Sequence, residues 1–600
     1  MFMDRIRMTL SRLAAPALLC LAIAAALPGA ARAQAPLTTH AERSGFLETG
    51  RYPEVIELCE AFATRYPDAV RCTDFGTTPQ GRPMKALVVS QSGAFTPEQA
   101  RERGLPVTLI QGGIHAGEID GKDAGFLALR QLLEGEASPG VLQMQVFVFV
   151  PVFNVDGHER FKAWNRPNQR GPKEMGWRTT AQNLNLNRDY LKAEAPEMQA
   201  MLRLMEAWDP LVYVDLHATN GAQFEHDISI QVEPVNSGDP ALREAGRALR
   251  DGTIAALSEA GSLPLPFYPS FVQHDNPASG FEDGVSPPRF SHGYMPYRNR
   301  FGMLVETHSW KEYPERVQTT RNTILAVLDL VAANGARWMG LAREADARAE
   351  RLGGSPVELD YGATDACRRF DFRGYEYTRT PSEVSGGIMT RYDEATPEVW
   401  NVPLCDDIAP ALVVDAPKAG YLVPAEQADR VAPKLDLHGV QYRRLEQPLQ
   451  GARVQAFRAV AANLAARSME GLQRIELEGD WEAETHDLVA GALYVPIAQA
   501  RSRMAMALLE PEAPDSLAAW GWFNNAFERK EYMEAYVAEQ VAREMLGDRR
   551  TKAEFERRLR EDEEFASSAQ ARLDWFYRRH DAWDDRLDLY PVFRTDRAPR

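Results

Sequence analysis

The sequence predicts an α/β fold in which a mixed central sheet carries helices on both of its faces. Apolar runs typical of buried strands occur at residues 84–90, 107–111, 142–152, 211–216 and 302–306. Apolar residues at helical spacing occur at residues 52–66, 119–135, 195–207, 239–260 and 319–333. Strands that alternate with helices in this way are typical of a sheet that is covered on both faces.

The length of the chain predicts further domains, because 600 residues are too many for one hydrophobic core. The composition changes after a charge-rich stretch that ends at Gly353-Gly354. We therefore expect the α/β domain to occupy residues 34–345. A smaller β-rich domain should follow at residues 355–515, where short apolar runs alternate, and a helical region laced with charge at residues 516–600.

The first 33 residues predict a secretory signal peptide. Three arginines precede an apolar run at residues 13–27, and Ala31-Arg-Ala33 has the small residues of a cleavage site. The protein would then be exported to the periplasm or to the outside of the cell. An uncleaved membrane anchor is the alternative, although the apolar run is short for one. After cleavage, no other stretch is expected to span a membrane.

Cleavage would also change the charge of the protein. It would remove four arginines and one aspartate, so the formal net charge would go from −17 to −20. A strongly acidic protein is a poor partner for nucleic acid or for an anionic membrane.

Four cysteines remain after cleavage, namely Cys59, Cys72, Cys367 and Cys405. An even number in an oxidising compartment permits two disulfides, with Cys59–Cys72 and Cys367–Cys405 as the local pairing. Connectivity does not follow from the sequence, and free buried thiols are the alternative.

The first candidate functional residues lie in the turn after the strand at residues 107–111. Gly112-Gly113 ends this strand, and His115 and Glu118 precede the next helix. A strand that stops at a Gly-rich turn before a helix is where open α/β sheets bind ligands. One imidazole nitrogen and one carboxylate can form half of a zinc site, which needs a third ligand from elsewhere. The alternative is a surface loop with two polar residues.

Two other predicted strands end on ionisable residues. One leads to His217, which is either a third metal ligand or a histidine that caps the strand. The other leads to Glu306, which is either an exposed strand end or a residue of a cleft. The long irregular segment at residues 261–300 precedes Glu306 and predicts a wall of that cleft, with a solvated loop as the alternative.

Taken in order, these residues resemble the zinc carboxypeptidase family, the funnelins related to carboxypeptidase A. The family order is His-x-x-Glu, Arg, Asn-Arg, His and Glu, and the chain has all five parts. The segment from Arg178 to Arg188 is similar to that of regulatory-type members. Phe75-Gly-Thr-Thr-Pro-Gln-Gly-Arg-Pro83 is similar to the Gly-x-Ser-x-x-Gly-Arg signature before the first central strand. The resemblance extends over residues 52–330 and indicates a bacterial-type exported member with a C-terminal extension.

The resemblance implies a metal site and a general base. His115, Glu118 and His217 would hold one Zn2+ ion, which leaves a coordination position for a water molecule. Glu306 would act as the general base that takes the proton of this water and passes it to the leaving amine.

The resemblance also implies residues that contact the substrate. Arg178 would stabilise the oxyanion of the transition state, and Arg166 and Arg170 are nearby rivals for this role. Asn187 and Arg188 would bind the C-terminal carboxylate of the substrate, because a guanidinium offers two parallel N–H donors to a carboxylate. This pair would make the enzyme an exopeptidase.

The chain departs from the family pattern at two places. The family commonly has Asp two residues before Asn-Arg, where it orients the first zinc histidine, and this chain has Asn185. An amide oxygen can accept the imidazole N–H but supplies less charge. The mobile tyrosine of the family's cleft has no clear counterpart. Tyr294 and Tyr297 are the candidates, and we favour Tyr294 as the substrate-binding residue.

The sequence thus predicts an exported zinc metallocarboxypeptidase whose partner is a peptide with a free C-terminal carboxylate. A sub-class that trims peptidoglycan stem peptides is favoured by export alone. Carboxylates that could line a pocket for a C-terminal Lys or Arg, or simply face water, are Glu225, Asp227, Asp275, Glu282 and Asp283.

Two other classes of protein remain open. One is a zinc amidohydrolase similar to aspartoacylase or succinylglutamate desuccinylase, because Asp215-Leu-His-Ala-Thr219 is similar to the third-ligand segment of those enzymes. They are smaller and act on cytoplasmic metabolites, which argues against this class. The other is a non-catalytic binding protein on the same scaffold, for which Asn185 is the only support.

Overall fold

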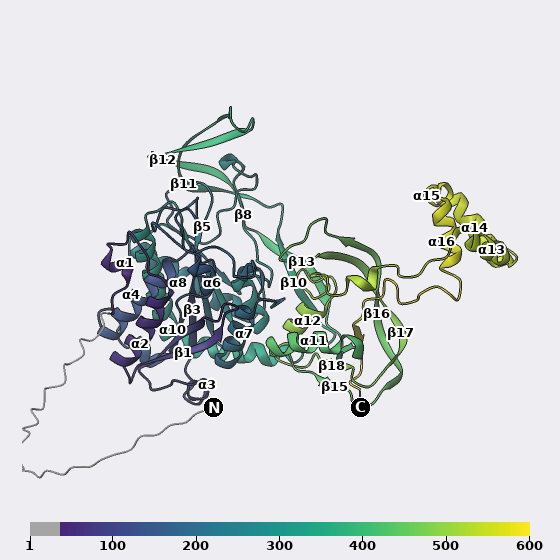
Figure 1. The fold of residues 1–600 in the computed structure, drawn as a ribbon, viewed down its shortest axis with the longest axis horizontal. Helices are drawn as coiled ribbons and strands as arrows, with labels where there is room; N and C mark the ends of the chain where they lie inside the picture. The colour runs from purple at the N-terminus through teal and green to yellow at the C-terminus, as the bar shows by residue number, and fades with distance from the viewer. Residues whose placement is uncertain (1–36, 600) are drawn as a thin grey trace, which may run out of the picture. The chain divides into compact units, whose positions relative to one another are not determined.

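The structure is a computed structural model that describes residues 37–599 (Figure 1). The chain from Leu37 onward forms one compact unit. The predicted signal peptide lies outside the described residues, so it stays a prediction. The boundaries of the predicted domains also stay predictions.

An eight-stranded mixed sheet forms the core of the first half of the chain. Its spatial order is β1 (Val70–Thr77), β2 (Pro83–Val89), β4 (Val146–Val150), β3 (Val107–Gly112), β5 (Val212–Thr219), β9 (Phe301–His308), β6 (Ile228–Glu233) and β7 (Pro264–Leu265). The central strands β4, β3, β5 and β9 are parallel, and β2 and β6 flank them in the antiparallel sense. Every residue of these four central strands is buried, which explains their continuous apolar runs.

Amphipathic helices cover this sheet. The main ones are α2 (Tyr52–Arg65), α4 (Asp120–Glu134), α7 (Pro196–Trp208), α8 (Arg243–Glu259) and α10 (Tyr313–Ala349). Helix α10 packs against α4 and α8, whereas α2 and α7 both contact β1. The predicted α/β class with a mixed central sheet is therefore confirmed.

Some predicted elements differ from the observed ones. The run at residues 142–152 contains the strand β4 only at Val146–Val150, because Val141–Met144 forms the short helix α5. Strands β1 and β6 were not predicted: β1 has few apolar residues, whereas β6 alternates Ile228, Ile230 and Val232 with polar residues and is a strand signal that was missed. Helix α10 joins the predicted helix at residues 319–333 and the charge-rich helix predicted at residues 343–351 into one, because Trp338, Ala342 and Ala345 keep its helical face buried.

By length and composition alone, α10 is apolar enough to cross a membrane. Its apolar residues instead pack on the sheet and on α4 and α8, as a core helix does.

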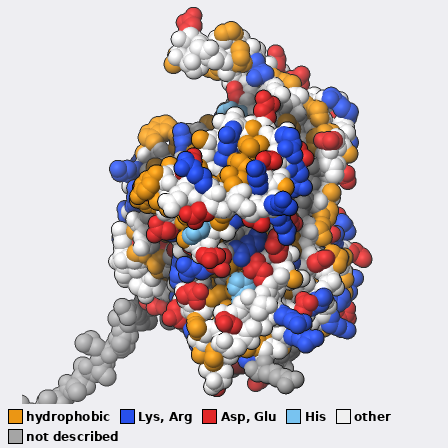
Figure 2. All heavy atoms as spheres, turned by 90° about the vertical axis from the view of Figure 1, so that its right-hand side faces the viewer, with side chains coloured by type: hydrophobic (Ala, Val, Ile, Leu, Met, Phe, Trp, Pro, Cys, Tyr) orange, Lys and Arg blue, Asp and Glu red, His pale blue; other side chains and the backbone are white. Residues whose placement is uncertain are grey.

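On the face shown in Figure 2, acidic and basic side chains are interspersed with small apolar groups.

The second half of the chain is rich in strands, as expected. A long hairpin of β11 (Arg368–Pro381) and β12 (Ile388–Cys405) extends a sheet that includes β8 (Phe281–Glu282), and β10 (Pro356–Ala363) pairs with β13 (Ile408–Asp415). A six-stranded sheet has the order β15 (Arg443–Arg444), β18 (Leu493–Pro496), β14 (Gly420–Val423), β19 (Phe593–Thr595), β16 (Leu449–Leu464) and β17 (Ile475–Leu488). The helices of this half are α11 (Ala425–Leu437), α12 (Ser502–Leu509), α13 (Ala535–Met545), α14 (Arg549–Glu561), α15 (Glu563–Ser567) and α16 (Ala569–Tyr577).

Both predicted disulfides are confirmed. Cys59 of α2 is bonded to Cys72 of β1, which fastens a covering helix to the edge of the central sheet. Cys367 is bonded to Cys405 at the base of the β11–β12 hairpin. Each bond closes a loop of the chain and so restricts the unfolded state.

The carboxyl group of Glu197 predicts a pH-dependent stability. It lies at the start of α7, is fully buried, and neither of its oxygens has a partner among the described residues. Burial, together with Asp156 and Asp189, raises the pKa of Glu197 from 4.5 to about 7. The folded state therefore holds this proton more tightly than the unfolded state, and the free energy of unfolding falls as the pH rises from about 4.5 to 7.

Replacing Glu197→Gln should remove this loss. We expect equal stability of variant and wild type at pH 4, and a variant more stable by about 1–3 kcal/mol at pH 8, measured by urea unfolding. Glu57→Gln on the exposed face of α2 is the matched control and should show no such difference. A Glu197→Gln variant that is less stable than wild type at pH 8 would contradict the prediction.

Candidate metal centre and substrate cleft

The candidate ligands and base meet at the carboxyl end of the central parallel strands. His115 and Glu118 lie in the turn after β3, and His217 and Glu306 lie near the ends of β5 and β9. In the register of the two strands, His217 is directly opposite Glu306. Residues opposite each other on paired strands point to the same face of the sheet, so both side chains can reach one cleft.

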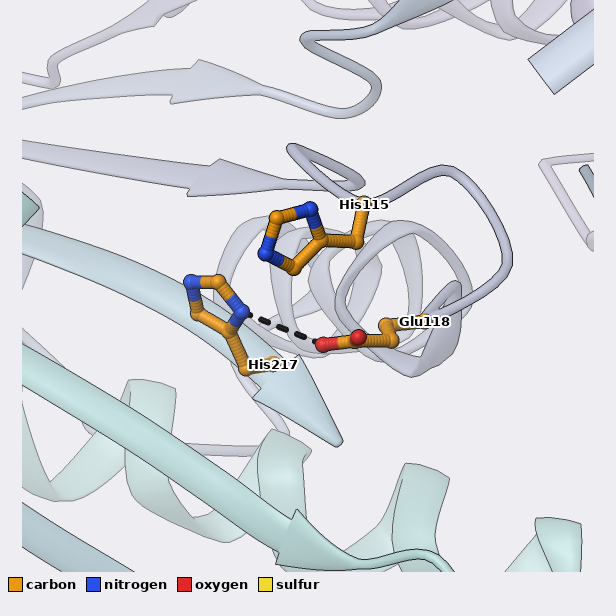
Figure 3. Close-up of side chains that lie close together, drawn as sticks. All are labelled: His115, Glu118 and His217. Atoms are coloured by element: carbon orange, nitrogen blue, oxygen red, sulfur yellow. Dashed lines mark hydrogen bonds and ion pairs between the residues drawn. The ribbon is translucent and has the colours of Figure 1, made fainter. Parts of the chain in front are cut away.

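Three side chains converge on one point. One ligand atom from each of His115, Glu118 and His217 lies within 4.8 Å of the others, and all three residues are buried (Figure 3). Nδ1 of His217 lies 3.1 Å from Oε2 of Glu118, and this oxygen also accepts a hydrogen bond from the backbone N–H of Ala218. Nδ1 of His115 is buried and has no partner among the described residues.

These residues fit a zinc ion. Two imidazoles and one carboxylate are a usual ligand set of a catalytic zinc site with one open position. The buried, unpartnered nitrogen of His115 is costly unless a cation or a donor satisfies it. Burial lowers the pKa of His115 well below 6.5, so the ring is neutral and its lone pair is free to bind a metal.

The carboxylate of Glu118 is held in its charged form. Burial would raise its pKa, but Arg166 and the hydrogen bond and charge of His217 outweigh burial and hold the pKa of Glu118 well below 4.5. Oε1 of Glu118 lies 2.7 Å from Nη1 of Arg166 and 3.2 Å from Nη1 of Arg178. Glu118 is thus ionised, as a metal ligand must be.

Asp215 orients the third candidate ligand. Its Oδ2 lies 2.7 Å from Nε2 of His217, at ion-pair distance although not in hydrogen-bond alignment, and its Oδ1 accepts a hydrogen bond from Gln111. Burial opposes protonation of His217, but Asp215 and Glu306 raise the pKa of His217 well above 6.5. A carboxylate behind a ligating histidine fixes the ring and increases its basicity. Residues two apart on a strand point to the same face of the sheet, so the Asp-x-His spacing in the sequence could have predicted the pairing of Asp215 with His217.

The orienting role expected of Asn185 is not seen. Its side-chain oxygen accepts a hydrogen bond from the backbone N–H of Asn187, so it caps the short helix η1 (Leu186–Arg188). No hydrogen bond joins this oxygen to the ring of His115 among the described residues.

The carboxyl group of Glu306 faces the cleft. It is 8% exposed, and its Oε2 has no partner among the described residues. Burial raises the pKa of Glu306 to about 8. The negative charges of Glu118 and Asp215 raise this pKa further, and the positive charge of His217 opposes the rise. A carboxyl group with a raised pKa is suited to take up a proton near neutral pH.

The three candidate arginines differ in position. Arg178 lines the cleft and is about one-third exposed, whereas Arg166 is buried and also donates to the backbone oxygen of Ala218. Arg170 does not line the cleft, because it forms an ion pair with Glu394 of the β11–β12 hairpin. Of these three, Arg178 is best placed to contact a substrate.

Asn187 and Arg188 line the cleft together. The side-chain oxygen of Asn187 accepts a hydrogen bond from the backbone N–H of Ser291. Arg188 has no carboxylate partner among the described residues, and its guanidinium lies over the ring of Phe290 at 4.2 Å. Burial, together with Arg178 and Arg289, lowers the pKa of Arg188 to about 10, so the group stays charged at neutral pH.

The cleft is a cavity of about 400 Å3. Its lining includes the candidate ligands, Glu306, Arg178, Asn187 and Arg188, and one wall comes from residues 268–292. Tyr268 is a wall residue that was not predicted, and its hydroxyl oxygen accepts a hydrogen bond from Oγ1 of Thr219 at 2.8 Å. An aromatic residue inside an irregular segment has no periodicity to reveal it.

The prediction for Tyr294 is wrong. Tyr294 is fully buried outside the cleft, and its hydroxyl lies 2.8 Å from Nδ1 of His438. Tyr297 is also not in the cleft, since its hydroxyl donates to the backbone oxygen of Leu359. Tyr294 belongs to the short helix α9 (Ser291–Tyr294) and Tyr297 to the next turn, η4 (Met295–Arg298). These turns direct both side chains into the core.

Most of the acidic residues considered for a basic pocket lie elsewhere. Glu225 is paired with Arg373, and Asp227 and Asp275 accept hydrogen bonds from backbone N–H groups. Glu282 and Asp283 do line the cleft. Burial raises the pKa of Asp283 to about 6.

A model of the zinc carboxypeptidase family matches residues 55–247. The match covers His115, Glu118, Arg178, Asn187, Arg188 and His217. It confirms the resemblance that the order of the motifs predicted, and this part of the chain is recognised as zinc carboxypeptidase-like.

Solved structures of carboxypeptidases are similar to about half of the chain. A provisionally assigned carboxypeptidase A of Shewanella denitrificans is 18% identical, with 48% of this chain and 71% of that chain covered and a TM-score of 0.36. Carboxypeptidase A of Helicoverpa armigera is 16% identical over 48% and 74%, with a TM-score of 0.35. A metallo-carboxypeptidase of Burkholderia cenocepacia is 16% identical over 46% and 69%, with a TM-score of 0.33.

The position of Asp215 predicts its effect on metal affinity. Asp215→Asn should weaken Zn2+ binding by about 10–100-fold, because the amide supplies less negative charge behind His217. Competition with a chromophoric chelator measures this affinity. Asn185→Ala is the informative comparison and should change the affinity by less than about threefold. Equal losses in both variants would mean that Asn185 does act on the metal centre.

Proposed function

We propose that the protein is a zinc-dependent metallocarboxypeptidase that hydrolyses the C-terminal peptide bond of peptides. The observation that carries the proposal is the distribution of charge in one cavity. Three candidate metal ligands and Glu306 line one cavity together with Asn187 and Arg188, and Arg188 has no carboxylate partner in the described part of the chain. The match of residues 55–247 to the zinc carboxypeptidase family supports the same reaction class.

Each residue of the site has a chemical role in this proposal. His115, Glu118 and His217 would hold the ion, which supplies Lewis acidity for the scissile carbonyl and lowers the pKa of a water molecule. Glu306 takes the proton of the attacking water on its free carboxylate oxygen and delivers it to the leaving amine.

The arginines act on charge at two different places. Arg178 presents a fixed positive charge to the oxygen on which negative charge develops. Arg188 has no carboxylate partner among the described residues, so the free carboxylate of a substrate can form an ion pair with it. Binding of the chain end at Arg188 would place the last peptide bond near Glu306 and would exclude internal bonds.

We also propose that the protein acts outside the cytoplasm. The basic leader and apolar run before residue 34 support this, and so do the two disulfides, which persist in oxidising compartments.

A zinc amidohydrolase that releases an amino acid from a small N-acyl derivative is a second candidate. The specific observation in its favour is the pairing of Asp215 with His217. Both residues belong to the Asp-Leu-His segment that is similar to the third-ligand segment of such amidohydrolases. Such a substrate also carries a carboxylate that Arg188 could bind, so only the substrate test separates the two activities.

The substrate test is a digestion of a mixed peptide library followed by mass spectrometry. We expect stepwise loss of single C-terminal residues, which a chelator abolishes and added Zn2+ restores. Intact peptides together with hydrolysis of N-acyl amino acids would favour the amidohydrolase. No hydrolysis of either, with no zinc in the purified protein, would favour a binding protein.

Substitution of the base tests its role separately from metal binding. Glu306→Gln keeps the size of the side chain but removes the proton acceptor, so kcat should fall by about 10²–10⁴-fold. The zinc content should stay equal to that of wild type, because Glu306 is not among the three ligands. Activity within a few-fold of wild type would contradict the assignment.

Substitution of Arg188 tests the anchoring of the chain end. Arg188→Ala should raise KM by about 10–100-fold, and Arg188→Lys should restore only part of this loss because an ammonium lacks the planar pair of donors. Arg170→Ala is the control, since Arg170 pairs with Glu394 away from the cleft, and should leave KM unchanged. A fall in kcat at constant KM would speak against a role in anchoring.

A further inference from the structure

The segment that carries Asn187 and Arg188 is contacted by residues from the second half of the chain. Glu470 lies in the turn between β16 and β17, and its Oε2 accepts a hydrogen bond from the backbone N–H of Asn185 at 2.7 Å. Asn185 is the residue that caps η1, from which Asn187 and Arg188 project. Glu470 therefore holds the start of the short helix that presents the anchoring pair.

A second contact holds the part of the cleft wall that packs against Arg188. Asp515 is buried, and its two oxygens accept hydrogen bonds from the backbone N–H of Arg289 at 2.9 Å and from its Nη1 at 2.8 Å. The next residue, Phe290, carries the ring on which the guanidinium of Arg188 lies. Asp515 thus fixes the backbone that places this ring.

A third contact holds the chain that follows Arg188. Nζ of Lys434, in α11, donates to the backbone oxygens of Lys192 at 2.6 Å and of Ala193 at 2.9 Å. Nε2 of His438 lies 2.8 Å from the backbone oxygen of Leu191. Carbonyl groups in an irregular segment need such partners when they are buried, so this part of the chain would lose its conformation without α11.

The charge of Glu470 also bears on Arg188. Burial and the neighbouring Arg178 and Arg289 disfavour the charge of Arg188, whereas Glu470 favours it and partly restores its pKa. A side chain from the C-terminal half therefore stabilises both the position and the charge of this arginine.

We propose that the second half of the chain is a structural part of the substrate-anchoring site, in which Glu470 and Asp515 are positioning residues for Asn187 and Arg188. Neither residue touches the substrate; Glu470 acts through the backbone of Asn185 and Asp515 through Arg289 and Phe290. This inference rests on the proposed function only in that the anchored group is a substrate carboxylate. The positioning itself does not depend on which reaction follows.

Hydrogen exchange of the full-length protein tests the positioning without any activity. The variants are Glu470→Ala, Glu470→Gln and the control Glu478→Ala, which removes an exposed carboxylate from β17. We expect exchange in residues 185–191 to be about tenfold faster in Glu470→Ala, because a hydrogen bond to a charged acceptor is lost. Glu470→Gln, whose neutral amide oxygen still accepts, should exchange more slowly than Glu470→Ala, and the control should exchange as the wild type does. Unchanged exchange in Glu470→Ala would overturn the proposal.

Kinetics with a peptide that has a free C-terminal carboxylate test the consequence for anchoring. Glu470→Ala should raise KM about tenfold and change kcat by less than twofold, and Glu470→Gln should recover most of the loss. Inhibition by acetohydroxamate, which chelates the metal and carries no carboxylate, should be within twofold of wild type in all variants. A parallel loss of acetohydroxamate affinity would show general damage to the site and would overturn the proposal.

The two readouts separate this inference from the proposed function. A wild type that hydrolyses no peptide overturns the proposed function, while the exchange measurement still decides whether Glu470 holds residues 185–191. Faster exchange at an unchanged KM overturns the claim that this segment anchors the substrate. Asp515→Ala, which removes both acceptor oxygens, is a second variant for the same measurements, and here faster exchange is expected at residues 289–291.

Discussion

The common orientation of β3, β5 and β9 is the constraint on which the rest of the site depends. Parallel strands end at the same edge of a sheet, so residues distant in the sequence meet there without any long loop. The turn after β3 supplies His115 and Glu118, and the paired ends of β5 and β9 supply His217 and Glu306. Because all three strands are buried, their register is strongly fixed, and the relative position of these side chains is fixed with it.

This arrangement concentrates charge in a place that is poorly hydrated. The charges of Glu118 and Asp215 both raise the pKa of Glu306, and His217 and Arg166 offset only part of this effect. Buried carboxylates are costly unless they are paired or coordinate a metal. A divalent cation between His115, Glu118 and His217 would reduce that cost, and the same electrostatics that favour the ion keep Glu306 able to accept a proton.

The second half of the chain is joined to the first by secondary structure as well as by side chains. Strand β8, which ends beside Asp283 in the cleft wall, pairs with β12 next to the disulfide of Cys405. The turn with Glu470 and the buried Asp515 reach the cleft from another direction. A short α/β domain with irregular cleft walls gains from such supports, because loops without regular hydrogen bonding have few internal contacts to define one conformation.

The sequence by itself determined the α/β class, the order of the main elements and the residues that converge as candidate metal ligands, and it offered the local disulfide pairing without deciding it. Each of these depends on nearby residues or on a motif of fixed spacing, and such signals are read along the chain. Only the tertiary structure decided that Asn185 caps a turn and that Tyr268 rather than Tyr294 lines the cleft. It also decided that Glu470 supports the anchoring pair. These contacts join segments that are far apart in the sequence, or they lie in irregular loops. Such loops have no hydrophobic periodicity from which the direction of a side chain could be predicted.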